Sequence, residues 1–193
     1  MTTTFEQIFQ NNKVNLASAA QKSRTWFDQQ ARLIAAQRIQ PMSLIRSDSA
    51  RNKSRIVPGE LYLFQYDAKH HDTLPYWDMF PLVFPFSKTP DGFIGLNMHY
   101  LPYMYRIKLL DRLMQFKTSK NLTETTKLRY SWGTIAGVSK FKWAEPCVHR
   151  YLSSQVQSPY KKIDSGDWAT ALMLPVERFV GAQKLKVWNE SLK

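Results

Sequence analysis

The sequence has a single cysteine, Cys147, among its 193 residues. One thiol excludes an intramolecular disulfide framework, and it excludes any zinc site that depends on several cysteines. Such sparing use of cysteine is typical of a protein that works in a reducing compartment. Because a free cysteine behaves as a small apolar residue, we expect Cys147 to be a buried and unreactive thiol.

Long apolar segments are also missing. No apolar run approaches the roughly 20 residues needed to cross a bilayer, and the opening MTTTFEQIFQNN lacks the basic and apolar regions of a signal peptide. The mean hydropathy is −0.41, although 44% of the residues are hydrophobic and can form a core. We therefore expect a protein without membrane contact, of a length that suits one domain with extensions.

Sequence motifs of catalysis are absent as well. The chain has no GxSxG nucleophile elbow, no GxGxxG dinucleotide loop and no Walker phosphate loop. We therefore predict a non-enzymatic protein without a cofactor, a metal ion or a small-molecule substrate. A convergent active site built from scattered residues would leave no motif, so this prediction rests on the absence of known patterns.

One cluster of polar residues invites a metal or acid–base interpretation. Its members are Asp67, His70, His71, Asp72 and, further along the chain, Asp78 and His99. The two adjacent histidines would point in different directions on regular structure, and no HExxH motif accompanies them. We interpret the first four residues as part of a surface loop, and His99 as a hydrogen-bonded structural histidine.

Positive charge is what the sequence has in excess. Lysine and arginine number 27 against 15 acidic residues, for a net charge of +12 and a pI near 9.8. Residues 1–56 carry a net +6, residues 57–102 a net −3 and residues 103–193 a net +9. This balance favours a polyanionic partner, either a nucleic acid or an acidic protein surface, although many such charges only solvate helices.

The segment 58–102 differs from both of its flanks. It holds most of the prolines, and its apolar runs are separated by turn signals. The pattern predicts strands at residues 60–66, 80–86 and 93–98. Both faces of the first strand are largely apolar, so we expect that strand to be buried. The second strand must lie at an edge or be bulged, because Pro81 and Pro85 cannot donate hydrogen bonds. The predicted fold class is α+β, with a small twisted antiparallel sheet or partial β-barrel at about 58–98 flanked by helices on both sides.

Helical periodicity dominates the rest of the chain. We predict a polar arm at 1–14, a helix at 15–40 that Pro41 ends, a basic linker at 41–57, and a single α+β domain at 58–193. Within that domain, helices are expected after Pro102, at about 123–140 with Thr123 as its cap, at 145–152, and around Trp168.

Nine cations are predicted, on charge alone, to contact nucleic acid or a partner protein. They are Arg46, Arg51, Lys53, Arg55, Lys140, Lys142, Arg150, Lys161 and Lys162. The first four lie in the serine-rich linker, where a flexible segment could fold onto a phosphate backbone. Lys140 and Lys142 alternate with aromatic residues that could stack on bases or, equally, lie in the core. No helix-turn-helix, zinc-finger or RNP motif is present, so we expect binding to backbone, shape or an end rather than to a base sequence.

Two segments resemble a known family. They are PGELYLFQYDAKHHDTLPYWDMFPLVFPF with the following GFIGLNMHYLP, and FKWAEPCVHRYLSSQVQSPYKKI with the later DWATALMLPVERF. Both are similar to DNA end protector-type minor virion proteins of large contractile-tailed bacteriophages, the T-even and cyanophage types. The resemblance implies a virion protein, assembled in the host cytoplasm, that covers the ends of linear double-stranded DNA and helps to complete the head. It offers no functional residues to carry over.

A second hypothesis needs no DNA contact. The chain could be a structural component of the neck, tail or baseplate that docks on neighbouring virion proteins, with its basic surface against acidic ones. The aromatic central segment would then be a rigid docking face, since exposed aromatic residues are favoured at interfaces. Exposure of Trp77, Phe80 and Tyr100 would favour this hypothesis, whereas their burial would make the segment a structural core.

Overall fold

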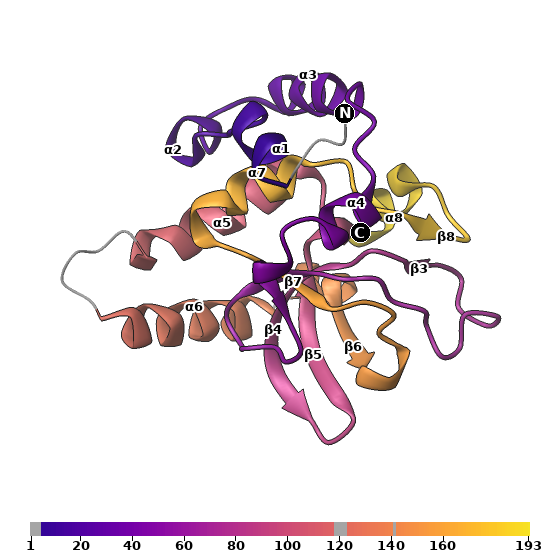
Figure 1. Ribbon diagram of the computed structural model, residues 1–193. Helices are drawn as coiled ribbons and strands as arrows, with labels where there is room; N and C mark the ends of the chain where they lie inside the picture. Colours follow the sequence, from indigo (N-terminus) through magenta and orange to yellow (C-terminus); the bar gives the residue numbers. More distant parts are fainter. Residues whose placement is uncertain (1–4, 118–122, 141) are drawn as a thin grey trace.

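The computed structural model describes residues 5–117, 123–140 and 142–193 (Figure 1). Its helices are α1 (Phe5–Asn11), α2 (Leu16–Ala19), α3 (Arg24–Ala35), α4 (Pro41–Arg46), α5 (Tyr103–Lys117), α6 (Glu124–Val138), α7 (Trp168–Met173) and α8 (Lys184–Ser191). Its strands are β1 (Asn52–Lys53), β2 (Leu61–Leu63), β3 (Trp77–Asp78), β4 (Leu82–Thr89), β5 (Gly92–Asn97), β6 (Val148–Leu152), β7 (Tyr160–Ile163) and β8 (Phe179–Val180). None of the helices in these ranges is long and apolar enough to cross a membrane.

Six strands form one antiparallel sheet in the order β1-β7-β2-β4-β5-β6, and β3 pairs with β8 separately. The predicted α+β class and antiparallel sheet are therefore confirmed. The sheet is open rather than barrel-like, because β1 and β6 lie at its two ends. It also includes residues 52–53, 148–152 and 160–163, which lie outside the segment where the strands were expected.

Strand β4 shows how proline is accommodated inside a sheet. Pro85 pairs with Gly95, and the register shifts between Pro85 and Ser87, which marks a β-bulge. Because β4 lies between β2 and β5, the bulged alternative of the prediction is the one that applies. A Cβ atom at Gly95 would clash with the side chain of Val83, so the position opposite the proline requires glycine.

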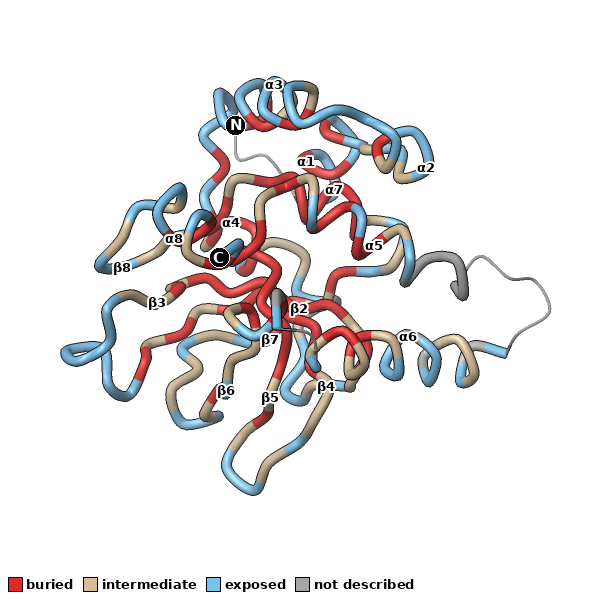
Figure 2. Tube along the Cα trace, turned by 180° about the vertical axis from the view of Figure 1, so that it is seen from behind, coloured by how far each residue is buried: buried red, intermediate tan, exposed pale blue. Residues whose placement is uncertain are grey.

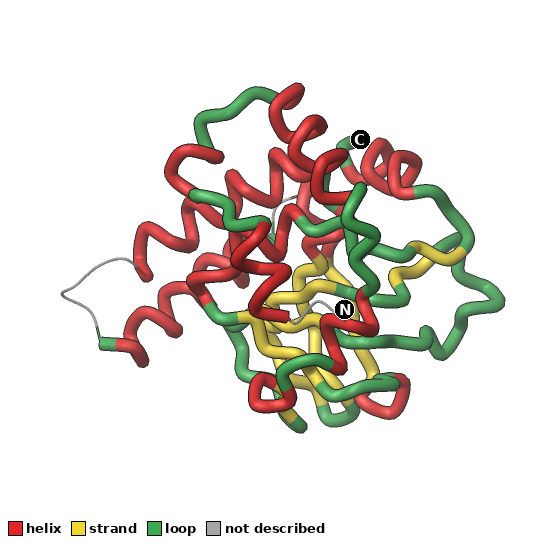
Figure 3. The backbone as a smooth tube through the Cα atoms, turned by 45° about the horizontal axis from the view of Figure 1, so that its top comes forward, coloured by secondary structure: helices red, strands yellow, loops and turns green. Residues whose placement is uncertain are grey.

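The centre of the sheet buries side chains on both faces, and the tube there is red in Figure 2. Figure 3 shows the strands gathered below most of the helices. Leu61 and Leu63 of β2 belong to the large core that the helices share. Tyr62 and Phe64 point the other way and join a second cluster, which we call the aromatic cluster, with Tyr66, Ala68, Val83, Phe93, Tyr151 and Tyr160. The expectation that both faces of this strand are apolar and buried is confirmed. In Figure 1 the main helical layer lies above the strands.

The N-terminal third contains more regular secondary structure than the predicted arm, single helix and linker. Residues 5–11 form α1, which buries Phe5 in the large core. The expected helix at 15–40 is divided into α2 and α3, and Ser23 begins the latter by accepting a hydrogen bond from the Trp26 amide. Pro41 starts α4 rather than ending α3, because proline is favoured in the first turn of a helix. Whether these segments are separate folding units stays a prediction.

The C-terminal half agrees with the sequence pattern in its helices but not at 145–152. Helix α6 begins after Thr123, whose hydroxyl accepts a hydrogen bond from the Thr126 amide, as predicted. The helix expected at 145–152 is wrong: Val148–Leu152 forms β6, and 3-10 helix Lys142–Cys147 precedes it. Strand β6 exists because it pairs with β5, a partner more than fifty residues away in the chain that local periodicity does not reveal.

Two glycines of α6 allow a direct test of its stability. A Cβ atom built at Gly133 or Gly137 would meet no described atom within 4 Å. We expect Gly133→Ala and Gly137→Ala each to raise the free energy of unfolding by about 0.5–1 kcal/mol, because alanine loses less backbone entropy in a helix. Urea denaturation measures this change. Gly95→Ala is the opposite control and should lower the free energy of unfolding. An unchanged free energy of unfolding in both Gly133→Ala and Gly137→Ala would contradict the expectation.

Candidate nucleic-acid interface

The nine predicted cations occupy three kinds of environment. Arg51 and Lys161 are engaged inside the protein. Arg150 and Lys162 are paired with carboxylates nearer the surface. The remaining five are exposed: Arg46, Lys53, Arg55, Lys140 and Lys142. Whether any of the nine contacts DNA stays a prediction, but only the last group is both exposed and outside any ion pair formed by the described residues.

Arg51 fastens the basic linker to the C-terminal half of the chain. Its Nε lies 2.8 Å from a carboxylate oxygen of Asp48, and its Nη1 lies 3.0 Å from both Asp164 and Asp167. The guanidinium carbon also lies 4.9 Å from the centre of the Phe5 ring in α1. With these partners, Arg51 is occupied in holding three distant segments together.

Lys161 is fully buried, with 0% of the residue exposed. Its Nζ donates hydrogen bonds to the carbonyl oxygens of Ser47 and Asp48 and lies 5.5 Å from the centre of the Phe5 ring. Burial lowers the pKa of Lys161 to about 8, against the opposing effect of Asp48. A phosphate could not reach this ammonium unless the linker were displaced, which a count of charges in the sequence does not reveal.

Lys162 points to the opposite face of the sheet from Lys161. Successive side chains of β7 point to opposite faces of the sheet, so Lys162 reaches Glu60, with Nζ 2.8 Å from Oε2. Arg150 on the edge strand β6 makes a similar surface pair, with Nη2 2.7 Å from both carboxylate oxygens of Asp91. Exposed ion pairs of this kind contribute little to stability, so a phosphate could replace Asp91 as the partner of Arg150.

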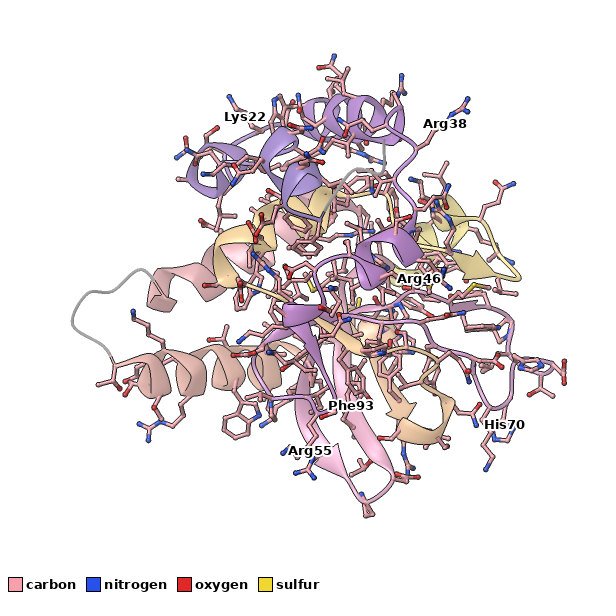
Figure 4. The ribbon with its side chains drawn as sticks, in the orientation of Figure 1. Lys22, Arg38, Arg46, Arg55, His70 and Phe93 are labelled. Carbon is pink, nitrogen blue, oxygen red and sulfur yellow. The ribbon has the colours of Figure 1, made fainter. Side chains whose placement is uncertain are left out.

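The N-terminal helices add exposed cations that the predicted set lacks: Lys13, Lys22, Arg24, Arg32 and Arg38. Figure 4 shows Lys22 and Arg38 over the α2–α3 layer, far from Arg55 near the opposite end of the molecule. The sequence carried the signal for this group, because the arginines fall largely outside the apolar face of the helical pattern. Exposed positive charge is therefore distributed over several elements rather than gathered on one.

The histidine and aspartate cluster is divided by the fold. His99 and Asp78 are buried together, with Nδ1 2.7 Å from Oδ2, which confirms His99 as a structural histidine. His71 stays on the exposed loop, 3.2 Å from Asp67 and 3.3 Å from Asp72. In the part of the chain that the structure describes, no three His, Cys, Asp or Glu side chains are placed to hold a metal ion.

The central aromatic segment is mostly core. Phe80 and Tyr100 are 7% and 5% exposed, while Trp77 is half-buried. Cys147 is completely buried, as expected, and burial raises the pKa of its thiol to about 12. These observations make most of residues 58–102 a structural centre that carries the basic flanks, with Trp77 more open than Phe80 and Tyr100.

Comparison with known proteins gives one assignment. Neither the curated proteins nor the solved structures provide a match. A family model described as the phage T4 terminal DNA protecting protein matches residues 1–191. The match spans nearly the whole chain, including both of the segments that carried the resemblance in the sequence. The chain belongs to the family of the phage T4 terminal DNA protecting protein.

Proposed function

We propose that this chain is a non-enzymatic virion protein that binds the ends of linear double-stranded DNA and protects them by covering them. The observation that carries the proposal is the family match over residues 1–191. The net charge of +12 supports it, because cations that replace the counterions of DNA phosphates bind the duplex without reading its sequence. In this mechanism no bond is made or broken, and an exonuclease is denied the free end it requires.

The ordered linker supports a phosphate-binding role for its three exposed cations. Arg46 ends α4, and Lys53 and Arg55 lie in and just after β1. Arg51 and Lys161 hold the backbone between these elements in one arrangement. A segment that is already ordered loses less conformational entropy on binding than a flexible one. Each phosphate contact therefore keeps more of its favourable binding free energy.

Neutralising these three side chains is expected to weaken DNA binding. In the combined variant Arg46→Gln, Lys53→Gln and Arg55→Gln, the slope of log affinity against log salt should fall by roughly 2 to 3, since each phosphate contact contributes about 0.9. Affinity for linear duplex at several salt concentrations measures this slope. The matched control removes the same charge from exposed positions elsewhere, as Lys108→Gln, Arg112→Gln and Lys186→Gln.

End protection requires a separate comparison. The unaltered protein should bind a linear duplex more tightly than a closed circle of the same sequence, and should slow its digestion by an exonuclease. Equal affinity for the linear duplex and the closed circle would show nonspecific binding rather than end recognition. The absence of binding at low salt would refute the proposed function. An equal loss of slope in the test and control variants would show that only net charge matters, not the linker.

A contact with a neighbouring virion protein is a second proposal, favoured by one surface. Helices α3, α5 and α8 line a groove of about 340 Å³, and its lining includes Tyr105, Leu185 and Leu192, which are 38%, 61% and 44% exposed. We assign this groove to a portal, neck, tail or baseplate protein, joined as the head is completed in the host cytoplasm. Cryo-electron microscopy of virions tests this: a few copies at the portal favour head completion, and a ring in the tail or baseplate favours a purely structural role.

A further inference from the structure

A cleft of about 640 Å³ lies between the loop that precedes β3 and the edge strand β6. Its lining includes seven aromatic rings, those of Tyr66, His70, Tyr76, Trp77, Tyr100, His149 and Tyr151. The volume falls in the range of about 300–1,000 Å³ typical of pockets for small organic ligands. The cleft can therefore enclose a single nucleotide but not a DNA duplex.

The rings form a nearly continuous wall. The centre of the Tyr100 ring lies 6.1 Å from that of Tyr76 and 4.2 Å from that of His149. Tyr151 continues the wall, 6.3 Å from His149 and 5.0 Å from Tyr66. Tyr66, Tyr100 and Tyr151 are 8%, 5% and 4% exposed and back the wall. Tyr76, Trp77 and His149 are half-buried, so they offer the ring surface on which a nucleobase can stack.

Two ring nitrogens belong to this wall, one buried without a partner and one already paired. The Nε1 atom of Trp77 is buried and has no hydrogen-bond partner among the described residues. His149 uses its Nε2 to contact the Pro146 carbonyl at 3.0 Å, and burial lowers the pKa of its ring to about 4. At neutral pH the imidazole is therefore uncharged, so it can stack on a neutral base without a desolvated charge.

Cations stand at the mouth of the cleft. Lys69 lies on the loop and is exposed, next to His70, which Figure 4 labels near the end of that loop. Arg150 lines the opposite side, held by its exposed pair with Asp91. Asp78 is the other acidic residue of the lining. Its carboxylate accepts hydrogen bonds from the His99 ring, the Asn97 side-chain amide and two backbone amides. The mouth can therefore attract a phosphate, while the interior favours an aromatic ring.

We propose that this cleft takes an unpaired nucleotide at the end of a DNA strand, with its base among the rings and its phosphate between Lys69 and Arg150. The inference rests on the proposed DNA-binding function and adds to it a site that distinguishes an end from the interior of a duplex. An unpaired or frayed terminal nucleotide enters such a pocket at the lowest energetic cost, whereas an internal base must first be unpaired and unstacked.

The test uses a duplex with one unpaired terminal nucleotide, at the 3′ or the 5′ end, that carries 2-aminopurine. Binding to the unaltered protein should quench its fluorescence, while the same label inside the duplex should stay unchanged. Trp77→Leu should lower affinity for this duplex by roughly tenfold and leave affinity for closed circular DNA unchanged. Trp132→Leu is the matched control, because Trp132 is 43% exposed on α6 and lies outside the cleft.

Lys69→Glu keeps the test decisive if Trp77→Leu fails to fold, since Lys69 is exposed and its replacement should leave the core intact. It should reduce the preference for the unpaired end as well. If neither variant alters that preference and terminal 2-aminopurine is not quenched, the cleft proposal is overturned while DNA end protection stands. If the unaltered protein binds no DNA at low salt, both proposals are overturned.

Discussion

Replacing Arg106 with methionine is expected to lower the free energy of unfolding by about 3–5 kcal/mol, because it leaves a buried carboxylate without its main counter-charge. Arg106 lies on α5 and is 0% exposed. Its three nitrogens donate to the carbonyl oxygens of Leu101 at 2.6 Å, Leu172 at 3.1 Å and His99 at 3.1 Å. One side chain thus joins the start of α5 to α7 and to the turn after β5.

Glu177 is the carboxylate that Arg106→Met would leave without its main counter-charge. It is buried, and its Oε1 lies 3.7 Å from Arg106 Nη2 and 3.4 Å from Lys184 Nζ. Burial alone would raise the pKa of Glu177, but Arg106, His99 and Lys184 outweigh it and bring the pKa down to about 2. The charged form therefore depends on these neighbours, of which Arg106 contributes most.

Equilibrium unfolding in urea measures the loss, with Arg112→Met as the control. Arg112 is an exposed arginine on the same helix, so its replacement should change the free energy of unfolding by less than about 0.5 kcal/mol. Combining Arg106→Met with Glu177→Leu should restore part of the stability, because the pair is then removed together. Equal midpoints for Arg106→Met and the unaltered protein would contradict the assigned role of this side chain.

Asp78→Ala is expected to lower the free energy of unfolding by about 3 kcal/mol or more, because it leaves several buried donors without an acceptor. Oδ2 of Asp78 accepts from His99 Nδ1 at 2.7 Å and from Asn97 Nδ2 at 3.1 Å. Oδ1 accepts from the backbone amides of Phe80 at 3.1 Å and Arg178 at 3.3 Å. The carboxylate therefore ties the small β3–β8 sheet to the end of β5.

Asp72→Ala is the matched control, because the Asp72 side chain is 92% exposed. Its removal should change the free energy of unfolding by less than about 0.5 kcal/mol. Asp78→Asn, which keeps the shape but weakens the charge-assisted bonds, should fall between the two. Thermal or urea unfolding of the three variants ranks their losses of unfolding free energy. Similar losses for Asp72→Ala and Asp78→Ala would show that burial of the carboxylate is not the cause.

These two aspartates show what a sequence pattern can and cannot distinguish. Both belong to one cluster of potential metal ligands in the sequence, only six positions apart. In the structure one is a surface carboxylate and the other is the acceptor at the centre of a buried network. The difference arises from Asn97, His99 and Arg178, which approach Asp78 from later parts of the chain.

Local features were readable where the physical cause is itself local. Pro81 and Pro85 predicted a strand that lies at an edge or is bulged, because proline lacks an N–H group, and the structure has a bulge after Pro85. Thr123 predicted the start of α6 because a cap needs only the next few residues. The alternation of apolar side chains in β2 predicted that both faces are buried. Strand β6 and helix α1 were not predicted, since each depends on partners distant in the chain.

Three properties could be inferred from the order of the residues alone: the excess of positive charge, the α+β class with a proline-rich antiparallel centre, and the family to which the chain belongs. Which cations face the solvent depends on contacts made by folding, because Arg51 meets Asp164 and Asp167, and Lys161 meets Ser47 and Asp48, across more than a hundred residues. Folding also forms the aromatic cleft, whose walls come from the loop before β3, the turn after β5 and the edge strand β6. Burial is a property of neighbours that folding brings together, so a count of charges could nominate the cations but could not tell which remain free for DNA.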